Sequence, residues 1–237
     1  MFYFDEFAGH RVLKSDLILD DEMKLFFTTR EFCVYSKTGG MENNFHELCA
    51  LLGQIPATNH AVHGVHIEKV NALQHEYMQT DALLLEKGAA MMSCADCVPI
   101  VLYVHGVGML AHSGWRGTAQ NMAKVSVQRL VKDYGVKPED IKAVIGPAIC
   151  GKCYEVGNEV YEALKKTVSV SQGLFQQKDE RFYVDLKGIN KKQLEEQGVE
   201  QIDVCPYCTA CGEGKKLFFS YRYENATPLR HSAVIQI

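Results

Sequence analysis

Three short segments of the sequence each carry one residue that could bind a metal ion, namely His63, Cys97 and His112. Each comes at the end of an apolar run and beside a residue that favours a turn, so we expect the side chains to lie at the rim of a sheet. One thiolate and two imidazoles suit zinc, and also copper. Because three protein ligands leave one position of a tetrahedral ion open, the set predicts a catalytic metal rather than a structural one.

The same residues have other interpretations, and spacing alone does not separate them. His63 and His112 could be core histidines with satisfied hydrogen bonds, and Cys97 an inert buried thiol. Alternatively, Cys97 could be the nucleophile of a cysteine amidohydrolase with His112 as its base. His60 and His66 lie three residues on either side of His63, but side chains alternate between the faces of a strand, so at most two of the three could share an ion.

Further cysteines could hold a second ion. Cys205, Cys208 and Cys211 follow one another at three-residue intervals, and a fourth ligand would have to come from elsewhere in the chain. Cys150 and Cys153 raise the same possibility. No fourth ligand is evident from the sequence.

Composition excludes several classes of protein. The chain of 237 residues is 47% hydrophobic and has a net charge of −4, so it lacks the basic excess of a nucleic-acid-binding protein. It contains no apolar run of about 18 residues that could span a membrane. Its N-terminal residues carry neither the basic nor the apolar part of an export signal. Nine cysteines without such a signal predict a reducing compartment, and hence a cytoplasmic protein that binds neither nucleic acid nor membrane.

The elements that must position these residues follow from hydrophobic patterning. Helices are expected over residues 42–52, 117–134, 156–166 and 187–197, with Thr118 capping the second. Strands are expected over residues 23–28, 61–67, 82–85, 89–93, 98–104, 109–112, 141–145, 202–204, 217–221 and 233–237. Gly106 and Gly108 can reverse the chain between the strands of Cys97 and His112, so these strands should pair. We therefore expect mixed sheets with helices outside them, in a single domain over residues 1–237.

Several motifs also occur in a characteristic order. They are His63-Gly64, Ala95-Asp96-Cys97-Val98-Pro99, His112-Ser113-Gly114-Trp115-Arg116-Gly117, Gly146-Pro147-Ala148-Ile149, Cys153-Tyr154-Glu155-Val156-Gly157, Cys208-Thr209 and Phe218-Phe219-Ser220-Tyr221-Arg222. With them the chain resembles the YfiH-like, laccase-domain family, long called multicopper polyphenol oxidases and now described as purine nucleoside phosphorylases. The resemblance implies an α+β fold, a layered α-β-β-α sandwich with mixed sheets. It also implies zinc or copper bound by His63, Cys97 and His112.

The resemblance further implies an activity and its small-molecule partners. The reactions would be phosphorolysis of adenosine, inosine and S-methyl-5'-thioadenosine, a transferase activity, and hydrolytic deamination of adenosine at the same site. The partners would be a nucleoside and phosphate, and the protein a monomer or a small homo-oligomer. A copper-dependent polyphenol oxidase is the alternative, although the chain has none of the His-x-His pairs that supply most ligands of a multicopper oxidase.

Arginines are the candidates for binding phosphate. Arg116 and Arg222 are preferred and Arg30 is a third, because a guanidinium offers two parallel donors to phosphate oxygens. Arg116 also precedes the helix expected at 117–134, whose N-terminal amides would favour an anion.

Three acidic residues could serve the same site. Asp81, Asp96 and Glu155 are candidate general acids or hydrogen-bond partners of a metal-bound imidazole. Asp96 should point away from Cys97 on a strand, which favours a hydrogen-bonding role at the strand end. Trp115 could stack on a purine or simply pack in its turn.

Overall fold

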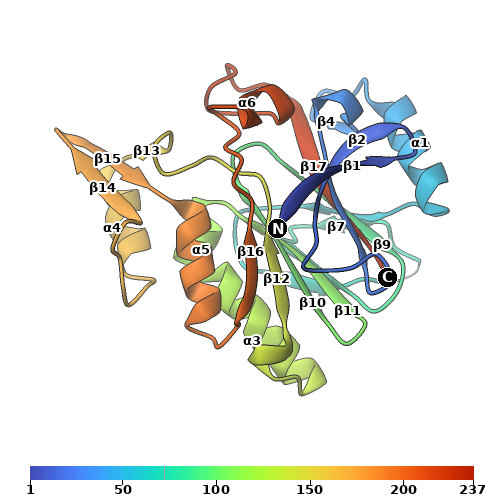
Figure 1. The fold of residues 1–237 in the computed structure, drawn as a ribbon, viewed down its shortest axis with the longest axis horizontal. Coiled ribbons are helices and arrows are strands. Elements are labelled where there is room, and N and C mark those ends of the chain that lie inside the picture. The colour runs from blue at the N-terminus through green and yellow to red at the C-terminus, as the bar shows by residue number, and fades with distance from the viewer. Residues whose placement is uncertain (72) are drawn as a thin grey trace.

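The protein is described by a computed structural model that covers residues 1–71 and 73–237. Two large mixed sheets run through the molecule, with helices at its periphery (Figure 1). In spatial order the first sheet contains β1 (Phe2–Phe7), β2 (His10–Ser15), β3 (Lys24–Thr28), β17 (Leu229–Gln236), β9 (Ala89–Cys94), β5 (Ala57–His60) and β7 (Glu76–Met78), with β4 (Tyr35–Ser36) paired to β17.

The second sheet carries the central hairpin of the fold. It contains, in order, β16 (Gln201–Val204), β12 (Lys142–Ile145), β10 (Val98–Val104), β11 (Val107–Ser113), β8 (Ala82–Leu85) and β6 (Ile67–Lys69). A smaller sheet contains β13 (Glu155–Val156), β15 (Arg181–Val184) and β14 (Phe175–Lys178). The helices are α1 (Glu42–Leu52), α2 (Trp115–Ala119), α3 (Met122–Tyr134), α4 (Asn158–Lys165), α5 (Leu186–Glu195) and α6 (Gly214–Leu217).

Alternation along the strands shows how the layers are stacked. Phe27 of β3 and Val101 of β10 belong to one buried apolar cluster, which lies between the two sheets. Their sequence neighbours point the other way: Phe26 packs in the cluster that includes α1, and Ile100 in the one that includes α3 and α5. The layers therefore run α1, first sheet, second sheet, α3 with α5. This confirms the expected α-β-β-α sandwich with mixed sheets.

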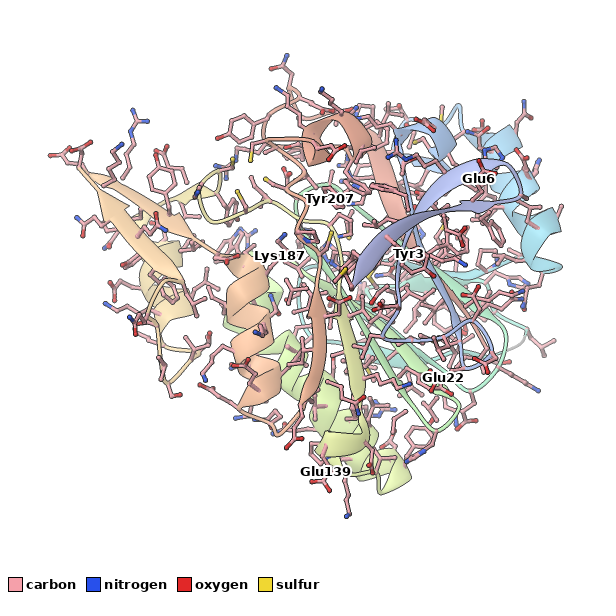
Figure 2. All side chains as sticks on the ribbon, in the orientation of Figure 1. Tyr3, Glu6, Glu22, Glu139, Lys187 and Tyr207 are labelled. Atoms are coloured by element: carbon pink, nitrogen blue, oxygen red, sulfur yellow. The ribbon has the colours of Figure 1, made fainter. Side chains whose placement is uncertain are left out.

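Most of the predicted elements are present, and the predicted hairpin forms. β10 and β11 pair antiparallel, with Pro99 opposite His112. Helix α1 has the predicted bounds, and Gly135 ends α3 in a left-handed conformation (φ +65°). Buried Lys187 ties α5 to the chain after β16, because its ammonium group donates to the carbonyls of Cys205 (2.6 Å) and Tyr207 (3.0 Å) (Figure 2).

Two of the strand predictions are wrong. Residues 61–66 form a loop between β5 and β6, because His63 has a φ of +65° and the amides of Val62 and His66 donate to the carboxylate of Asp81 instead of a neighbouring strand. Residues 217–221 end α6 and enter a turn in which the amide of Glu224 donates to the carbonyl of Ser220.

The helix expected at 117–134 is interrupted. It divides into α2 and α3 at Asn121, whose φ of +64° is incompatible with a right-handed helix. Thr118 lies inside α2 rather than capping the helix, and its hydroxyl donates to the carbonyl of Gly114 (3.0 Å). Arg116 consequently lies within the five-residue α2 and does not precede a long helix.

None of the helices within the described residues combines the length and the apolar character that a membrane crossing requires.

Candidate metal centre

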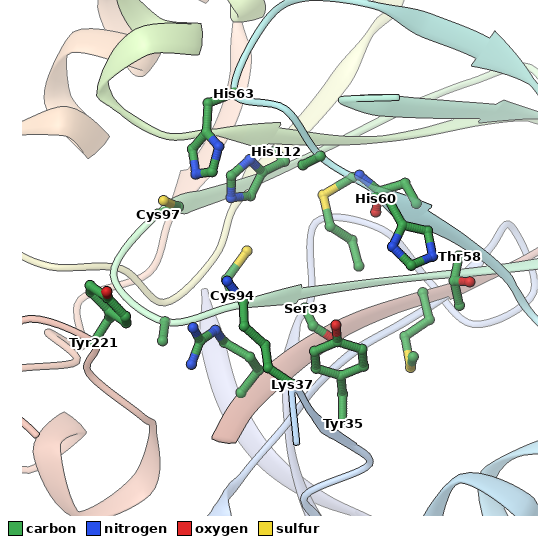
Figure 3. Close-up of a pocket in the computed structure, with 16 residues that line it drawn as sticks. Tyr35, Lys37, Thr58, His60, His63, Ser93, Cys94, Cys97, His112 and Tyr221 are labelled. Carbon is green, nitrogen blue, oxygen red and sulfur yellow. The ribbon is translucent and has the colours of Figure 1, made fainter. Parts of the chain in front are cut away.

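The side chains of His63, Cys97 and His112, called the triad below, converge in the folded chain. Their ligand atoms all lie within 4.8 Å of one another. They come from the loop between β5 and β6, the turn between β9 and β10, and strand β11. Figure 3 shows the three side chains facing one another at one end of a cavity. The geometry thus brings together the three residues that the sequence singled out.

Asp81 positions both histidines of the triad. It is fully buried, and its carboxylate accepts a hydrogen bond from the amide of Val62 (3.0 Å), next to His63. Its backbone carbonyl accepts from the amide of His112 (2.8 Å). A Cβ atom at Gly64 would lie 3.1 Å from the Asp81 carboxylate, so glycine allows the loop to pack this closely. Asp81 therefore holds the loop of His63 against the strand of His112.

Asp96 positions the thiol in a similar way. It has a φ of +85°, and its buried carboxylate accepts from the hydroxyl of Thr209 (2.6 Å) and from the amide of Arg222 (2.7 Å). These bonds tie the turn that carries Cys97 to the segments that precede and follow α6. Asp96 thus has the hydrogen-bonding role expected of it.

Burial makes the donors of the triad neutral when no cation is bound. It lowers the pKa of His112 to about 3, and nearby His63 contributes to the same direction. Burial likewise lowers the pKa of His63, against the opposing effect of Asp81. Burial also raises the pKa of the Cys97 thiol to about 12, with Asp96 adding to the increase.

A soft or borderline cation fits these donors. The Nδ1 atom of His112 is buried without a hydrogen-bond partner in residues 1–71 and 73–237, and both imidazoles are neutral as metal ligation requires. A bound cation displaces the proton of a thiol, so the sulfur binds the ion as a thiolate. A Cβ atom at Gly114 would come within 3.0 Å of both Cys97 Sγ and His63 Cδ2, so the glycine keeps the space beside the donors open.

A cavity of about 470 Å³ opens beside the triad, within the range of small-molecule sites. Its wall includes two cationic side chains, Lys37 and Arg230. Arg230 lies over the ring of Tyr221 (5.5 Å) and donates to the carbonyl of Leu229 (2.8 Å). The sequence analysis missed Lys37 and Arg230, because neither lies in a segment that carries a triad residue.

The predicted arginines lie elsewhere. Arg116 is exposed, with its guanidinium over the ring of Trp115 (4.3 Å). Arg222 donates to the carbonyl of Glu155 (2.7 Å) and lines a separate groove that Trp115 also lines. Arg30 forms an ion pair with Glu224. None of the three arginines lines the cavity of the triad.

Known proteins resemble this chain over most of its length. The profile of a family described as multi-copper polyphenol oxidoreductase laccase matches residues 34–237. A purine nucleoside phosphorylase of Deinococcus radiodurans is 33% identical over 178 residues, which cover 73% of this chain and 67% of that protein. The purine nucleoside phosphorylase YfiH of Escherichia coli is 30% identical over 174 residues, covering 70% and 68%. Adenosine deaminase RL5, from an unknown prokaryotic organism, is 35% identical over 137 residues, covering 55% and 51%.

The solved structure of YlmD from Geobacillus stearothermophilus has the same fold, with a TM-score of 0.87, 28% identity and 98% of each chain covered. The match of the family profile over most of the sequence decides the assignment. This chain is therefore an enzyme of the multi-copper polyphenol oxidoreductase laccase family, the family of the YfiH-like and YlmD-like proteins.

Proposed function

We propose that this protein is a zinc-dependent purine nucleoside phosphorylase that uses adenosine, inosine and S-methyl-5'-thioadenosine and also deaminates adenosine. One observation carries the proposal: the triad converges at the end of a cavity that also holds the cations Lys37 and Arg230. The names of the relatives support the reaction class. Copper is the alternative ion, because the same donors suit it.

The triad would hold the ion through three ligands and leave one position open. When bound, zinc supplies Lewis acidity and makes a water molecule acidic near neutral pH, as deamination requires. Asp81 and Asp96 keep the protein ligands in place through the hydrogen bonds described above. The exposed ring of Tyr221 at the cavity wall offers a flat surface on which a purine can stack.

Phosphorolysis also requires phosphate beside the glycosidic bond. We assign this role first to Lys37 and Arg230, because both face the same space as the triad. Arg116 and Arg222 stay candidates for an anion that approaches from the groove beside Trp115. Arg30 is the weakest candidate, since Glu224 already compensates its charge.

Two other functions receive less support. In a cysteine amidohydrolase, Cys97 and His112 would form a thiolate–imidazolium pair, but burial raises the pKa of the thiol to about 12 and lowers that of the imidazole to about 3. A multicopper oxidase needs many histidine ligands. Within the described residues the groups that could hold an ion are the triad and a set of four cysteines.

The phosphate requirement tests the proposal. Purified protein incubated with inosine should release hypoxanthine and ribose 1-phosphate when inorganic phosphate is present, and no hypoxanthine in phosphate-free buffer. Release without phosphate would identify a hydrolase instead. Metal analysis of the same preparation should find zinc, and replacing Cys97 with alanine should lower the zinc content by about one ion per chain.

We also place the protein in the cytoplasm, where a reducing environment maintains free thiols. All nine cysteines are unpaired in the structure, in agreement with this proposal.

A further inference from the structure

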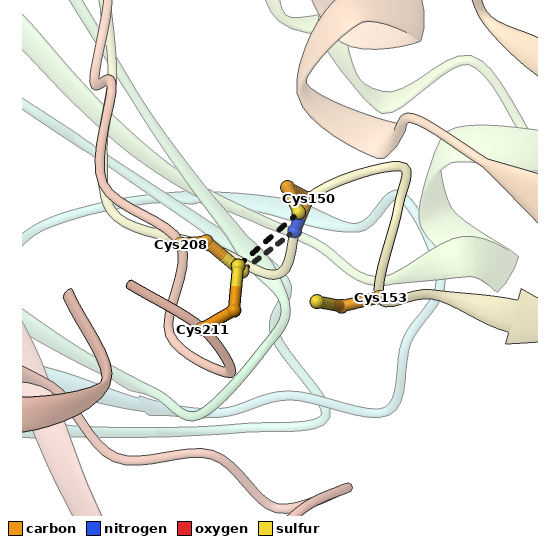
Figure 4. Close-up of side chains that lie close together, drawn as sticks. All are labelled: Cys150, Cys153, Cys208 and Cys211. Atoms are coloured by element: carbon orange, nitrogen blue, oxygen red, sulfur yellow. Dashed lines mark hydrogen bonds between the residues drawn. The ribbon is translucent and has the colours of Figure 1, made fainter. Parts of the chain in front are cut away.

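Four cysteines outside the triad also come together. The side chains of Cys150, Cys153, Cys208 and Cys211, called the quartet below, have sulfur atoms that all lie within 4.8 Å of one another. Figure 4 shows them gathered from two segments of the chain. One C-x-x-C pair lies between β12 and β13, and the other between β16 and α6.

The quartet differs from the grouping that the sequence suggests. Cys205 follows the same three-residue spacing as Cys208 and Cys211, but it is buried in the apolar cluster between the sheets and is not one of the four. Cys150 and Cys153 supply the other two sulfurs instead.

The spacing of the sulfurs matches that of a tetrahedral ion. With zinc–sulfur bonds of about 2.3 Å, two ligands of a tetrahedron lie about 3.8 Å apart. The sulfurs of Cys150 and Cys211 are 3.9 Å apart. A disulfide would instead require about 2.05 Å between two sulfurs.

Backbone amides are directed at one of these sulfurs. The amide of Cys150 lies 3.2 Å from the sulfur of Cys208, and the amide of Ala210 lies 3.4 Å from the same atom. Such N–H···S bonds orient a thiolate and offset part of its charge in metal centres. A Cβ atom at Gly214 would lie 2.3 Å from the carbonyl oxygen of Cys208, so glycine permits the close approach of α6 to this segment.

We propose that the quartet is a tetrathiolate site for a structural zinc ion. Four protein ligands complete the coordination sphere and leave no position for substrate, and paired C-x-x-C motifs are typical of such sites. The ion would join the segment between β12 and β13 to the segment between β16 and α6. This inference does not depend on the proposed reaction.

The same site would also stabilise the chain segments that contact the turn of Cys97. Cys208 precedes Thr209, whose hydroxyl donates to Asp96 beside Cys97 of the triad. On the other segment, the amide of Ile149, next to Cys150, donates to the backbone carbonyl of Asp96 (3.2 Å). Zinc in the quartet would thus hold both segments that contact the turn of the triad cysteine, so the quartet has a positioning role rather than a catalytic one.

Zinc content of variants tests the site separately from the triad. In a Cys97→Ala background, protein purified from zinc-supplemented medium should contain about one zinc ion per chain. Adding Cys211→Ser should reduce this to roughly none, because a ligand is lost. Adding Cys205→Ala, the matched control from the same run of cysteines, should leave the zinc content unchanged. Far-ultraviolet circular dichroism of each variant checks that the chain is folded.

Cobalt substitution gives a second readout. Cobalt(II) in the Cys97→Ala protein should produce the strong thiolate-to-cobalt charge-transfer absorption of a sulfur-rich site, and Cys211→Ser should weaken it while Cys205→Ala does not. The proposal is overturned if the Cys97→Ala protein contains no zinc, if Cys211→Ser leaves its zinc content unchanged, or if iron is the metal found. Failure of phosphorolysis with these results intact would refute the proposed function alone.

Discussion

The triad and the quartet both contain cysteine sulfur among their possible metal ligands, yet their surroundings differ. The triad supplies three donors, two of them imidazoles, and faces a cavity of about 470 Å³. The quartet supplies four thiols from two turns that bind each other. Because ligand number decides whether a coordination position is left for a reactant, the comparison separates a site suited to chemistry from a site suited to stability. Substitutions in each region can test this division.

The largest effect is expected at the thiol of the triad. Cys97→Ala should lower kcat/KM for inosine by roughly a thousandfold or more, because a catalytic metal contributes several kcal/mol to transition-state stabilisation. Steady-state assays at saturating phosphate measure the loss. Cys49→Ala is the control and should behave as the native protein, because this thiol of α1 belongs to neither the triad nor the quartet and does not line the cavity. Full activity of Cys97→Ala would leave the catalytic role of the triad without support.

A smaller effect is expected at Lys37, one of the two cationic side chains of the cavity wall. Lys37→Met should raise KM for phosphate roughly ten- to hundredfold, which corresponds to the loss of one charge-assisted hydrogen bond. Its KM for inosine should change much less. Lys178→Met, which removes an exposed lysine from β14, provides the control. An unchanged KM for phosphate would exclude Lys37 from the phosphate site.

Substitution of Arg222 distinguishes the cavity from the neighbouring groove. Arg222→Met should raise KM for phosphate only a few-fold, about the effect of one exposed charge, because this side chain lines the groove beside Trp115. Phosphate saturation curves of the two variants, measured side by side, give the ranking. A larger effect at Arg222 than at Lys37 would move the phosphate site into the groove, where the sequence analysis placed it.

The quartet should affect stability more than turnover. Cys211→Ser should lower Tm, because a structural metal stabilises the folded chain, while kcat/KM at low temperature falls by less than about tenfold. Thermal unfolding followed by circular dichroism and assays of the same sample measure both. A structural role for the quartet is contradicted if Cys211→Ser leaves Tm unchanged. It is also contradicted if this variant abolishes turnover as completely as Cys97→Ala does.

The last prediction concerns acid stability rather than turnover, and it compares His112 with a buried histidine outside the triad. Burial lowers the pKa of His231 to about 3, as it does for His112. Since both gain a proton only on unfolding, the free energy of unfolding of metal-free protein should be highest above about pH 6.5 and fall from there toward pH 3. His231→Leu should reduce this slope by about 1.4 kcal/mol per pH unit. Exposed His105 serves as the control in urea titrations, and equal slopes for His231→Leu and the native chain would refute the assignment.

The parts of the site that sequence reasoning found are those that local patterns encode. Cys97 directly precedes β10 and His112 lies on β11, and a tight turn joins these two strands, so the approach of the two side chains follows from the hairpin. His63 was found by its motif, but the strand predicted around it is a loop. The loop is held by hydrogen bonds from its amides to buried Asp81, a contact between distant residues that local patterns do not reveal. Lys37 had no such local signal.

The sequence by itself determined the donor types, the helical periodicity of α1, the β10–β11 hairpin and the family. Tertiary structure alone decided that Cys153 joins Cys208 while Cys205 stays in the core, and that Arg230 rather than Arg222 faces the triad. The physical reason is that hydrophobic period and turn chemistry act over a few residues. Contacts between distant segments depend instead on how two sheets and their connecting loops pack together.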